Sequence, residues 1–468
     1  MANHTVKQMF FDDGMLFGRD NADRVYGKVE RIAEYSDGVS STDFCSGNVF
    51  RLDDGRYRML YFAHGKQFSG RKFFSAVSDD GVNFVPEALG GGKKDYPHEV
   101  MPITKGDEIA CICEDIRGPE RYKLLMSEFD GRALTVTDTV YTSEDLLHWS
   151  KKEGSFWGDG TEPLASAFYN KHKKCFTIIQ RPFWGVRTVG CKTTKDWKHF
   201  SKFRHVLGVD SRDERLNEIY GMYAFEYEGT YIGIPHIYRG LDSEYGAKYK
   251  NGIIDCQLAY SADGEYWKRS LNVPFLTGGD ECPIVWVAGM IRRDDDILLY
   301  GTASGLVHGP AFHEPGNGRL FIYKLRSDGF IALKNGKNSP PARIITREKI
   351  WRGGELSLNV DAKNVTVGVY ETKESAGAVN LLGTASPIAG FSASDCISFS
   401  GDSTRHTPVF RSGNRIDSLK GKTLVFEINY SDGSLYSLSG NYTDVFNTEG
   451  ARYRRYGILP GEKLPDRR

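Results

Sequence analysis

The stretch "YSADGEYW" at residues 260–267 places Ser, Asp, Gly and Trp in a short polar segment after an apolar run. Three roles are open for it: part of a calcium loop, a catalytic site, or a turn of the chain. An aspartate carboxylate accepts hydrogen bonds from backbone N–H groups inside a turn, and Gly tolerates the angles that turns require. A calcium loop needs more oxygen ligands than one aspartate supplies. We therefore interpret the stretch as a structural turn.

The same pattern recurs along the chain, which is not expected of a catalytic residue. Before each copy lies a short alternating run, preceded by two strand-like runs around a turn such as Asp-Gly or Glu-Gly. Each unit therefore reads as four antiparallel strands, and five radially repeated units predict a five-bladed β-propeller over residues 40–333. The copies are "SDDGVNF", "TSEDLLHW", "TTKDWKHF", "SADGEYW" and, more loosely, "RSDGF", and they close with Phe84, Trp149, Phe200, Trp267 and Phe330.

The pattern changes after the fifth copy. Residues 334–342, "KNGKNSPPA", have the composition of a hinge, and strand-like runs then return without the aspartate turn. They predict a jelly-roll-like β-sandwich over residues 334–440. Residues 1–39 include "QMFFDD", an available strand for closing the propeller, and residues 441–468 are expected to form a strap or tail. The predicted fold class is all-β, a five-bladed β-propeller followed by a C-terminal β-sandwich.

Composition excludes several classes of function. The 61 basic and 61 acidic residues cancel, which argues against binding to nucleic acid or to an anionic membrane. No apolar run approaches the ~18 residues of a membrane helix. The start "MANHTVKQMFFDDG" lacks the pattern of a signal peptide, so we expect a cytoplasmic protein, or a secreted or periplasmic one if a leader has been removed. The eight cysteines show no metal-binding or disulfide spacing, and we expect core thiols.

Carboxylates precede the expected first strand of every unit. In a propeller these strands line the centre, so the side chains ahead of them converge in one pocket. Converging carboxylates repel one another and raise some of their pKa values, which suits acid–base chemistry on a glycosidic bond. Taken singly, each is as well explained as a solvated loop residue. They are Asp43, Glu114 and Asp115, Asp159 and Glu162, Glu218, and Asp280 and Glu281.

Residues suited to binding sugars lie in "QRPFWGVRTVG" and "PHIYRG". Aromatic faces stack on the C–H side of a sugar, and Arg donates to hydroxyl or carboxylate oxygens. A core role stays open for Trp184 and for His236, and the arginines also suit an anionic sugar or phosphate. The candidate substrate-binding residues are Arg181, Trp184, Arg187, His236 and Tyr238.

This architecture resembles that of the invertases, levanases and exo-inulinases, and the propeller alone is similar to that of the arabinanases, xylosidases and levansucrases. The resemblance implies that Asp43 is nucleophile or base, that Asp115 in "EDIRGPERYK" orients the sugar, and that Glu162 in "DGTEP" is the general acid. The Glu-Cys pair of invertases occurs here only in the fifth unit. Asp159, Glu218 and Glu281 therefore stay open as alternative catalytic residues.

A closer resemblance is to a group of bacterial propeller proteins known only as glycosidase-like. It rests on "PERYKLL", "RTVGCKTTKDWKHFS", "IYGMYAFEYEGTYIG" and "DCQLAYSADGEYW", and it implies no particular substrate. We expect a glycosidase that acts from a chain end on an oligo- or polysaccharide. A phosphorylase, a polysaccharide lyase and a non-catalytic carbohydrate-binding propeller remain alternatives. We expect no required cofactor and no metal site, leave room for a structural calcium or sodium ion on the axis, and leave the oligomeric state open.

Overall fold

The chain is all-β in its described parts. Apart from the short 3-10 helix η4 (Ile416–Leu419), the regular elements of these residues are β-strands, which confirms the predicted class. The computed structural model describes residues 5–38, 48–64, 71–89, 96–103, 108–118, 120–130, 135–156, 162–182, 185–240, 251–309, 317–372 and 386–445.

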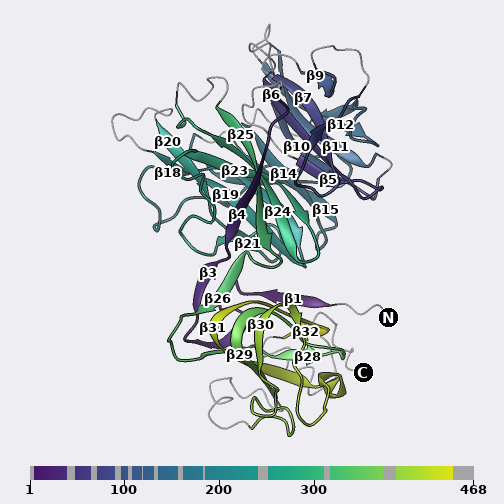
Figure 1. Cartoon of the computed structure of the whole chain (residues 1–468). Helices are drawn as coiled ribbons and strands as arrows, with labels where there is room; N and C mark the ends of the chain where they lie inside the picture. The colour runs from purple at the N-terminus through teal and green to yellow at the C-terminus, as the bar shows by residue number, and fades with distance from the viewer. Residues whose placement is uncertain are drawn as a thin grey trace. The chain divides into compact units, whose positions relative to one another are not determined.

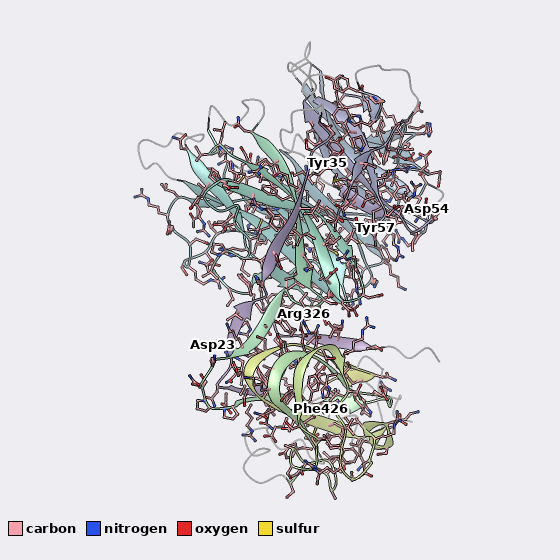
Figure 2. All side chains as sticks on the ribbon, viewed as in Figure 1. Asp23, Tyr35, Asp54, Tyr57, Arg326 and Phe426 are labelled. Carbon is pink, nitrogen blue, oxygen red and sulfur yellow. The ribbon has the colours of Figure 1, made fainter. Side chains whose placement is uncertain are left out.

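Two compact units make up the chain. One is residues 29–325, and the other combines residues 1–28 with residues 326–468. The N-terminal segment is thus divided between the units, whereas the sequence suggested that all of residues 1–39 serve the propeller. Each unit has buried aromatic side chains of its own: Tyr35 and Tyr57 belong to the first unit and Phe426 to the second (Figure 2).

The unit 29–325 contains five consecutive groups of mainly antiparallel strands (Figure 1). The fourth and fifth groups belong to one sheet, because a parallel pairing of Ile254 with Ile284 joins them. Turn residues recur about every ten residues, and apolar residues alternate with polar ones between them. This pattern explains why the segments form strands rather than helices. The first four groups are β5 (Asn48–Arg51), β6 (Tyr57–His64), β7 (Arg71–Ser78) and β8 (Val85–Pro86), with β9 (Glu99–Pro102) added to β7; β10 (Glu108–Glu114), β11 (Tyr122–Asp130), β12 (Thr135–Ser143) and β13 (Ser150–Phe156); β14 (Glu162–Asn170), β15 (Cys175–Arg181), β16 (Val189–Thr194) and β17 (Arg204–Leu207); and β18 (Asn217–Tyr227), β19 (Thr230–Gly240), β20 (Gly252–Cys256) with β21 (Ala259–Ser261), and β22 (Lys268–Arg269).

The fifth group takes its outer strand from the N-terminal part of the chain. Strands β23 (Ile284–Arg292), β24 (Asp296–Ser304) and β25 (Gly318–Arg326) are followed in the sheet by β4 (Val29–Tyr35). The expectation that "QMFFDD" supplies this strand is wrong. Its strand, β1 (Val6–Met9), instead pairs with the long C-terminal strand β31 (Thr423–Gly440).

The first strands of the five groups follow one another in space. β10 lies beside β14, β14 beside β18, β18 beside β23, and β23 beside β5. Between β5 and β10, the Asn48 side-chain oxygen accepts a hydrogen bond from Ile112 N at 3.3 Å. Apolar cores fill the spaces between neighbouring groups, for example Tyr57 and Tyr61 of the first group with Leu298 and Tyr300 of the fifth. Apolar burial between neighbouring groups therefore contributes to holding the unit together.

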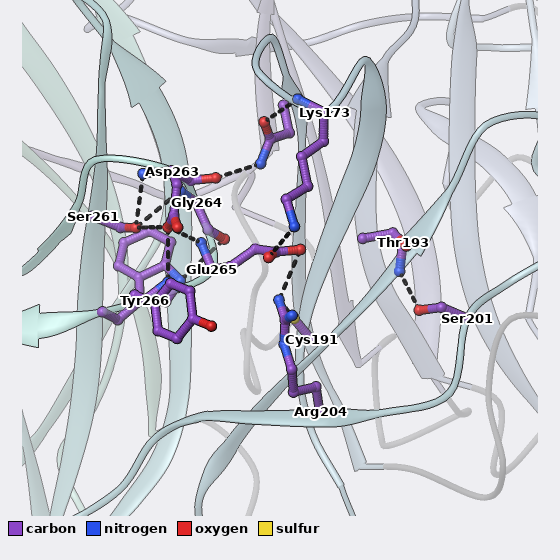
Figure 3. Close-up of polar contacts among 12 residues, drawn as sticks. Lys173, Cys191, Thr193, Ser201, Arg204, Ser261, Asp263, Gly264, Glu265 and Tyr266 are labelled. Atoms are coloured by element: carbon purple, nitrogen blue, oxygen red, sulfur yellow. Dashed lines mark hydrogen bonds and ion pairs between the residues drawn. The ribbon is translucent and has the colours of Figure 1, made fainter.

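Four of the repeated aspartate turns share one hydrogen-bond pattern. In the opening stretch, Asp263 Oδ1 accepts from the Ser261 hydroxyl at 3.0 Å and from the backbone N–H groups of Glu265 and Tyr266 at 2.9 Å (Figure 3). The residue after the aspartate has a positive φ, which Gly264 adopts freely. The corresponding aspartates of the other three turns are Asp80, Asp145 and Asp196.

The turn of the fourth group also joins two groups. Glu265 forms ion pairs with Lys173, from the turn after β14, and with Arg204 Nη2 on β17 at 2.7 Å (Figure 3). Asn170 Nδ2, at the end of β14, donates to Asp263 O at 2.6 Å. The repeated turns are therefore structural, as the sequence indicated, and this one ties the third group to the fourth.

The fifth copy, "RSDGF", is not a turn of this kind. Asp328 accepts hydrogen bonds from Lys7 Nζ at 2.8 Å, Ser437 Oγ at 2.6 Å and Asn359 Nδ2 at 3.2 Å, all within the unit that contains the C-terminal residues. In the other groups the aspartate turn leads into the outer strand. In the fifth group β4 supplies the outer strand, so no such turn follows β25. The chain leaves the group after β25 instead.

The second unit is one antiparallel sheet of ten strands in its described residues. The long strands β29 and β31 pair with each other and pass through several bulges, which bend a sheet. A two-layered sandwich remains a prediction, and of the expected strap only β32 lies within the described residues. The remaining strands are β2 (Leu16–Asp20), β3 (Asp23–Tyr26), β26 (Ile331–Asn335), β27 (Ala342–Thr346), β28 (Lys349–Trp351), β29 (Ser357–Glu371), β30 (Phe399–His406) and β32 (Tyr442–Asp444).

Candidate functional site

The candidate site lies at the starting ends of the first strands. The aspartate turns mark the opposite ends, because Asn170 at the end of β14 contacts the turn at Asp263. At the starting end, the backbone pairs Glu162 of β14 with Arg181 of β15. The neighbouring group pairs Glu218 of β18 with Tyr238 of β19. Four of the residues selected from the sequence are thus placed at one end of two adjacent groups.

Glu218 and Arg187 form the charged centre of this site. Arg187 donates to the Glu218 carboxylate twice, from its backbone N at 3.1 Å and from Nη1 at 2.5 Å. The two contacts come from adjacent groups of strands, because Arg187 lies just before β16 and Glu218 at the start of β18. A charge-assisted double contact of this kind holds the carboxylate in one orientation. Both side chains remain partly accessible to solvent.

Tyr220 lies beside this pair, and its ring contacts the guanidinium groups of both Arg181 and Arg187. The Arg181 guanidinium lies 4.4 Å from the centre of the Tyr220 ring and that of Arg187 lies 5.4 Å from it. Arg181 Nη1 also donates to Tyr220 O at 3.0 Å. Cations over aromatic faces are attracted by the ring quadrupole, most strongly where water is excluded. Arg181 is buried, so Tyr220 orders a guanidinium at the base of the site.

Two residues of the fifth group complete an aromatic wall around Tyr220. The Trp286 ring lies 6.0 Å from the Tyr220 ring with an angle of 15° between the planes. His308 Nε2 lies 3.2 Å from the Tyr220 hydroxyl, within hydrogen-bond distance. Sequence reasoning missed Tyr220, Trp286 and His308. Strand alternation alone identifies Tyr220, because positions two apart share one face and Glu218 was already a candidate.

Tyr238 belongs to the same wall, whereas His236 is a core residue. Tyr238 is buried, and its ring lies 5.0 Å from the Arg187 guanidinium and 5.3 Å from the His308 ring. His236 Nε2 lies 3.0 Å from Val287 O, and burial lowers the pKa of His236 to about 3. A neutral histidine enclosed between two strands does not face a substrate. The core interpretation therefore explains His236 better than the substrate-binding one.

Several candidates cannot be placed in this geometry. Asp43, Asp159 and Trp184 lie outside the described residues. For Glu162 the structure describes the backbone, at the first position of β14, but not the side chain. Their assigned roles stay predictions.

Asp115 lies at the wrong end of its group for the role suggested by the sequence. We expected it ahead of a first strand, but "EIACICE" forms that strand, β10, and Asp115 follows it in the turn to β11. Its carboxylate accepts from Trp197 Nε1 at 2.9 Å, in the aspartate turn of the third group. Seven residues at about 3.3 Å each place it roughly 20 Å from the starting end of β10. Asp115 therefore joins two groups of strands.

The electrostatics of Asp115 agree with a structural role. Burial acts to raise its pKa, but the hydrogen bonds from Trp197 and Arg117 outweigh burial, and the pKa is lowered. The Arg117 guanidinium in turn lies 3.7 Å from the Tyr169 ring centre. A carboxylate held ionised by the buried Trp197 donor and by the exposed Arg117 stabilises the fold at neutral pH and is a poor proton donor.

The ion-pair partners of Glu281 are Arg319 and Arg31, neither of which belongs to the aromatic wall. Its side chain is 67% exposed, and Oε2 lies 3.5 Å from Arg319 Nη1 and 3.7 Å from Arg31 Nη1. These are weak, solvent-screened pairs on the fifth group. Cys282, the other half of the invertase-like pair, is fully buried.

Arg239, considered from the sequence as a phosphate ligand, is engaged by a carboxylate. Its Nε lies 2.5 Å and its Nη2 3.2 Å from the two Asp255 oxygens. Burial raises the pKa of Asp255, with the Arg239 pair opposing that rise. This bidentate pair leaves Arg181 and Arg187 as the arginines of the candidate site.

The described residues contain no group of three or more His, Cys, Asp or Glu side chains that could hold a metal ion. They also include no helix with the length and apolar character needed to cross a membrane.

No protein-family model and no curated protein matches the chain. Among solved structures, a glycosyl hydrolase from Bacteroides ovatus has 15% sequence identity and a TM-score of 0.40, and the match covers 64% of this chain and 94% of that one. For the β-1,2-mannobiose phosphorylase from Listeria innocua, in complex with β-1,2-mannobiose, the values are 14%, 0.44, 69% and 96%. The chain is thus similar to these two proteins over about two thirds of its length, at a level too low to assign a family, an activity or a substrate.

Proposed function

We propose that the five groups of strands form a closed five-bladed β-propeller and that the starting ends of its first strands carry a glycosidase site. The order β5, β10, β14, β18 and β23, with β23 returning to β5, supports closure. The outer strand β4 supports it further, because it joins the N-terminal part of the unit to the last group. Closure of the ring buries the apolar faces of the first and fifth groups against each other, which an open array would leave exposed.

The chemistry assigned to this site is carboxylate acid–base catalysis. Glu162 protonates the leaving oxygen of the glycosidic bond, and Asp43 either attacks the anomeric carbon or activates the water that does so. Glu218 is held by Arg187, so we assign it to orienting the arginine and a sugar hydroxyl. Tyr220 and the arginines on either side of it form the sugar-binding wall. We expect the enzyme to act from a chain end.

The observation that carries this proposal is the grouping of Arg181, Arg187 and Glu218 beside Tyr220, with the Glu162 backbone paired to that of Arg181. Arg187 and Glu218 share a double hydrogen bond, and Tyr220 contacts both arginines. A partly accessible carboxylate such as Glu218, beside an ordered aromatic and guanidinium surface, is suited to binding a sugar.

The test is hydrolysis of neutral and acidic oligosaccharides by the purified full chain, with released sugars identified by chromatography. Glu162→Gln is expected to lower kcat about 10²–10⁴-fold, since it removes a general acid. Asp115→Asn, at the other end of the unit, serves as the matched control and should keep kcat. Absence of product from every oligosaccharide, together with retained sugar binding, would instead identify a carbohydrate-binding propeller.

A glycoside phosphorylase is the second candidate, and Arg181 and Arg187 are the observation that favours it. Two guanidiniums around one tyrosine ring can bind an anion such as phosphate as well as a sugar. Turnover that requires inorganic phosphate and yields a sugar phosphate would establish this reaction. Turnover that is indifferent to phosphate supports the hydrolase, and an unsaturated product would indicate a lyase.

A further inference from the structure

A cavity lies in the unit that contains the C-terminal residues, and none of the residues discussed for catalysis lines it. It encloses about 210 Å³. Three short segments form it: residues 354–356, just before β29; residues 407–410, just after β30; and residues 413–417, which lead into η4. All of these residues are described by the structure. No part of the proposed glycosidase site is involved.

The floor of the cavity is apolar and packed. Leu356, Phe410 and Ile416 are each no more than 5% exposed, so they present a fixed surface. Val409 lines the cavity and is 54% exposed. A ligand that covers Val409 gains the free energy of removing this apolar surface from water.

The rim of the cavity carries hydrogen-bonding groups of both charges. Arg415 Nη2 lies 2.7 Å from Glu355 Oε1, and both side chains are more than half exposed. Thr407 and Asn414 add a hydroxyl and an amide to the lining. Together with Asp417, the lining has more acidic than basic groups. A phosphate or sulfate group is therefore a poor match for it.

The backbone around the cavity is already ordered. Asp417 Oδ1 accepts a hydrogen bond from Gly354 N at 2.6 Å, which ties the first segment to the third. Gly354 and Gly413 have positive φ values of 86° and 73°, which only glycine adopts at low cost. Gly413 N also donates to Phe410 O at 2.9 Å. A preformed cavity binds a ligand without first ordering its loops.

We propose that this cavity binds one neutral sugar ring. Its volume of about 210 Å³ lies below the ~300–1,000 Å³ of sites for drug-sized ligands, so it suits a single ring. A pyranose or furanose ring has an apolar C–H face for Val409 and adjacent hydroxyls for the Arg415–Glu355 pair. The choice of a sugar among small polar ligands rests on the proposed function. The position of the cavity does not.

The ring can come from a free monosaccharide or from a residue of a polysaccharide, and the experiment separates these sources. Affinity electrophoresis measures retardation of the full chain in gels that contain soluble mannan, levan or arabinan. Calorimetric titration with mannose, fructose and arabinose measures binding of the free sugars. Both assays are run on Glu162→Gln, so that turnover does not remove the ligand.

Arg415→Ala and Glu355→Ala are each expected to weaken binding at least tenfold, because each removes one half of the rim pair. Lys363→Ala is the matched control: Lys363 forms an exposed ion pair with Asp432 in the same unit, outside the cavity lining. Its binding should equal that of the parent protein. Equal binding by all three variants, or no binding of any polymer or free sugar by the parent, overturns the proposal. Loss of binding in the rim variants without any turnover by the wild type overturns the proposed function but not this inference.

Discussion

At the scale of the residue, four aspartates stabilise the repeated turns. Asp80, Asp145, Asp196 and Asp263 each accept two backbone N–H groups and one hydroxyl within their own turn. The following residue has a positive φ, and in two turns it is Leu146 or Trp197 rather than glycine. Both side chains are buried, so their packing compensates for the backbone strain.

Removing one of these carboxylates should loosen the turn. Asp263→Ala leaves two backbone donors without an acceptor and is expected to lower the free energy of unfolding by about 1–3 kcal/mol. Tyr266→Ala, at a side chain 75% exposed in the same turn, should change it by no more than about 0.5 kcal/mol. Urea denaturation measures both. Equal effects of the two variants would contradict the assigned role of Asp263.

Acid should destabilise the fold through these turns. Hydrogen bonds to His199 and to the turn backbone lower the pKa of Asp196 in the folded protein. A carboxyl with a depressed folded pKa stabilises the protein fully above its unfolded pKa of about 4, and this contribution is lost as pH falls further. The urea midpoint of the wild type should therefore fall steeply below about pH 4. Asp196→Asn should show a shallower fall, and parallel curves would exclude this origin.

Asp115 is expected to matter for stability and not for turnover. Asp115→Ala leaves the buried Trp197 Nε1 donor unsatisfied, which costs about 1–3 kcal/mol. The kcat measured well below the unfolding midpoint should match that of the wild type. A loss of kcat with unchanged stability would restore Asp115 as a catalytic residue.

At the scale of the element, strand β4 decides how the unit 29–325 is completed. It pairs with β25, and the residue pair Tyr35 and Leu320 marks the end of this ladder. Beyond the strand, Asp37 Oδ2 accepts from the Tyr61 hydroxyl at 2.8 Å and lies 3.1 Å from His98 Nε2. These contacts attach the N-terminal strand to the first group, where the chain would otherwise be open.

Loss of this attachment should be costly. Asp37→Ala leaves a buried tyrosine hydroxyl and a buried histidine without their shared acceptor, and we expect a loss of about 2 kcal/mol or more in the free energy of unfolding. Ser36→Ala, at the exposed neighbouring position, is the matched control. The measurement is guanidinium unfolding followed by tryptophan fluorescence. An Asp37→Ala protein as stable as the control would show that β25 pairing alone holds β4.

Element boundaries explain which site residues could be predicted. The strands around Arg181, Glu162 and Glu218 were assigned correctly, because turn residues bound them on both sides. In the second group, the apolar runs on each side of "EDIRGPER" form β10 and β11, and alternation does not distinguish a first strand from a second. That shift of one strand moved Asp115 to the other end of its group of strands.

At the scale of the whole molecule, the two units have separate cores. The second unit buries Lys349 completely beside Asp444, a pair that links β28 to β32. Burial lowers the pKa of Lys349, with Asp444 opposing that effect. Charged pairs in such a place are costly to break, because removing one partner leaves an uncompensated charge.

Calorimetry should resolve two unfolding transitions. Asp444→Ala is expected to lower the transition of the unit that contains Lys349, by about 3–5 kcal/mol in unfolding free energy. Asp37→Ala should lower the other transition and leave the first in place. A single transition that moves with both substitutions would show that the units unfold together.

The amino-acid sequence by itself determined the all-β class, the repeated aspartate turn and the change of pattern after the fifth unit. These features are local: alternation, turn residues and hydrogen bonds between near neighbours specify them. Only the tertiary structure decided which strand completes the fifth group, at which end Asp115 lies, and that Tyr220, itself in contact with Trp286 and His308, lies beside both arginines. Those facts depend on contacts between residues tens to hundreds of positions apart, which local patterns do not encode. The turn at Asp263 illustrates the local and the long-range contributions. Hydrogen bonds within residues 260–267 determine its shape, whereas contacts with Asn170, Lys173 and Arg204 attach it to the neighbouring group of strands.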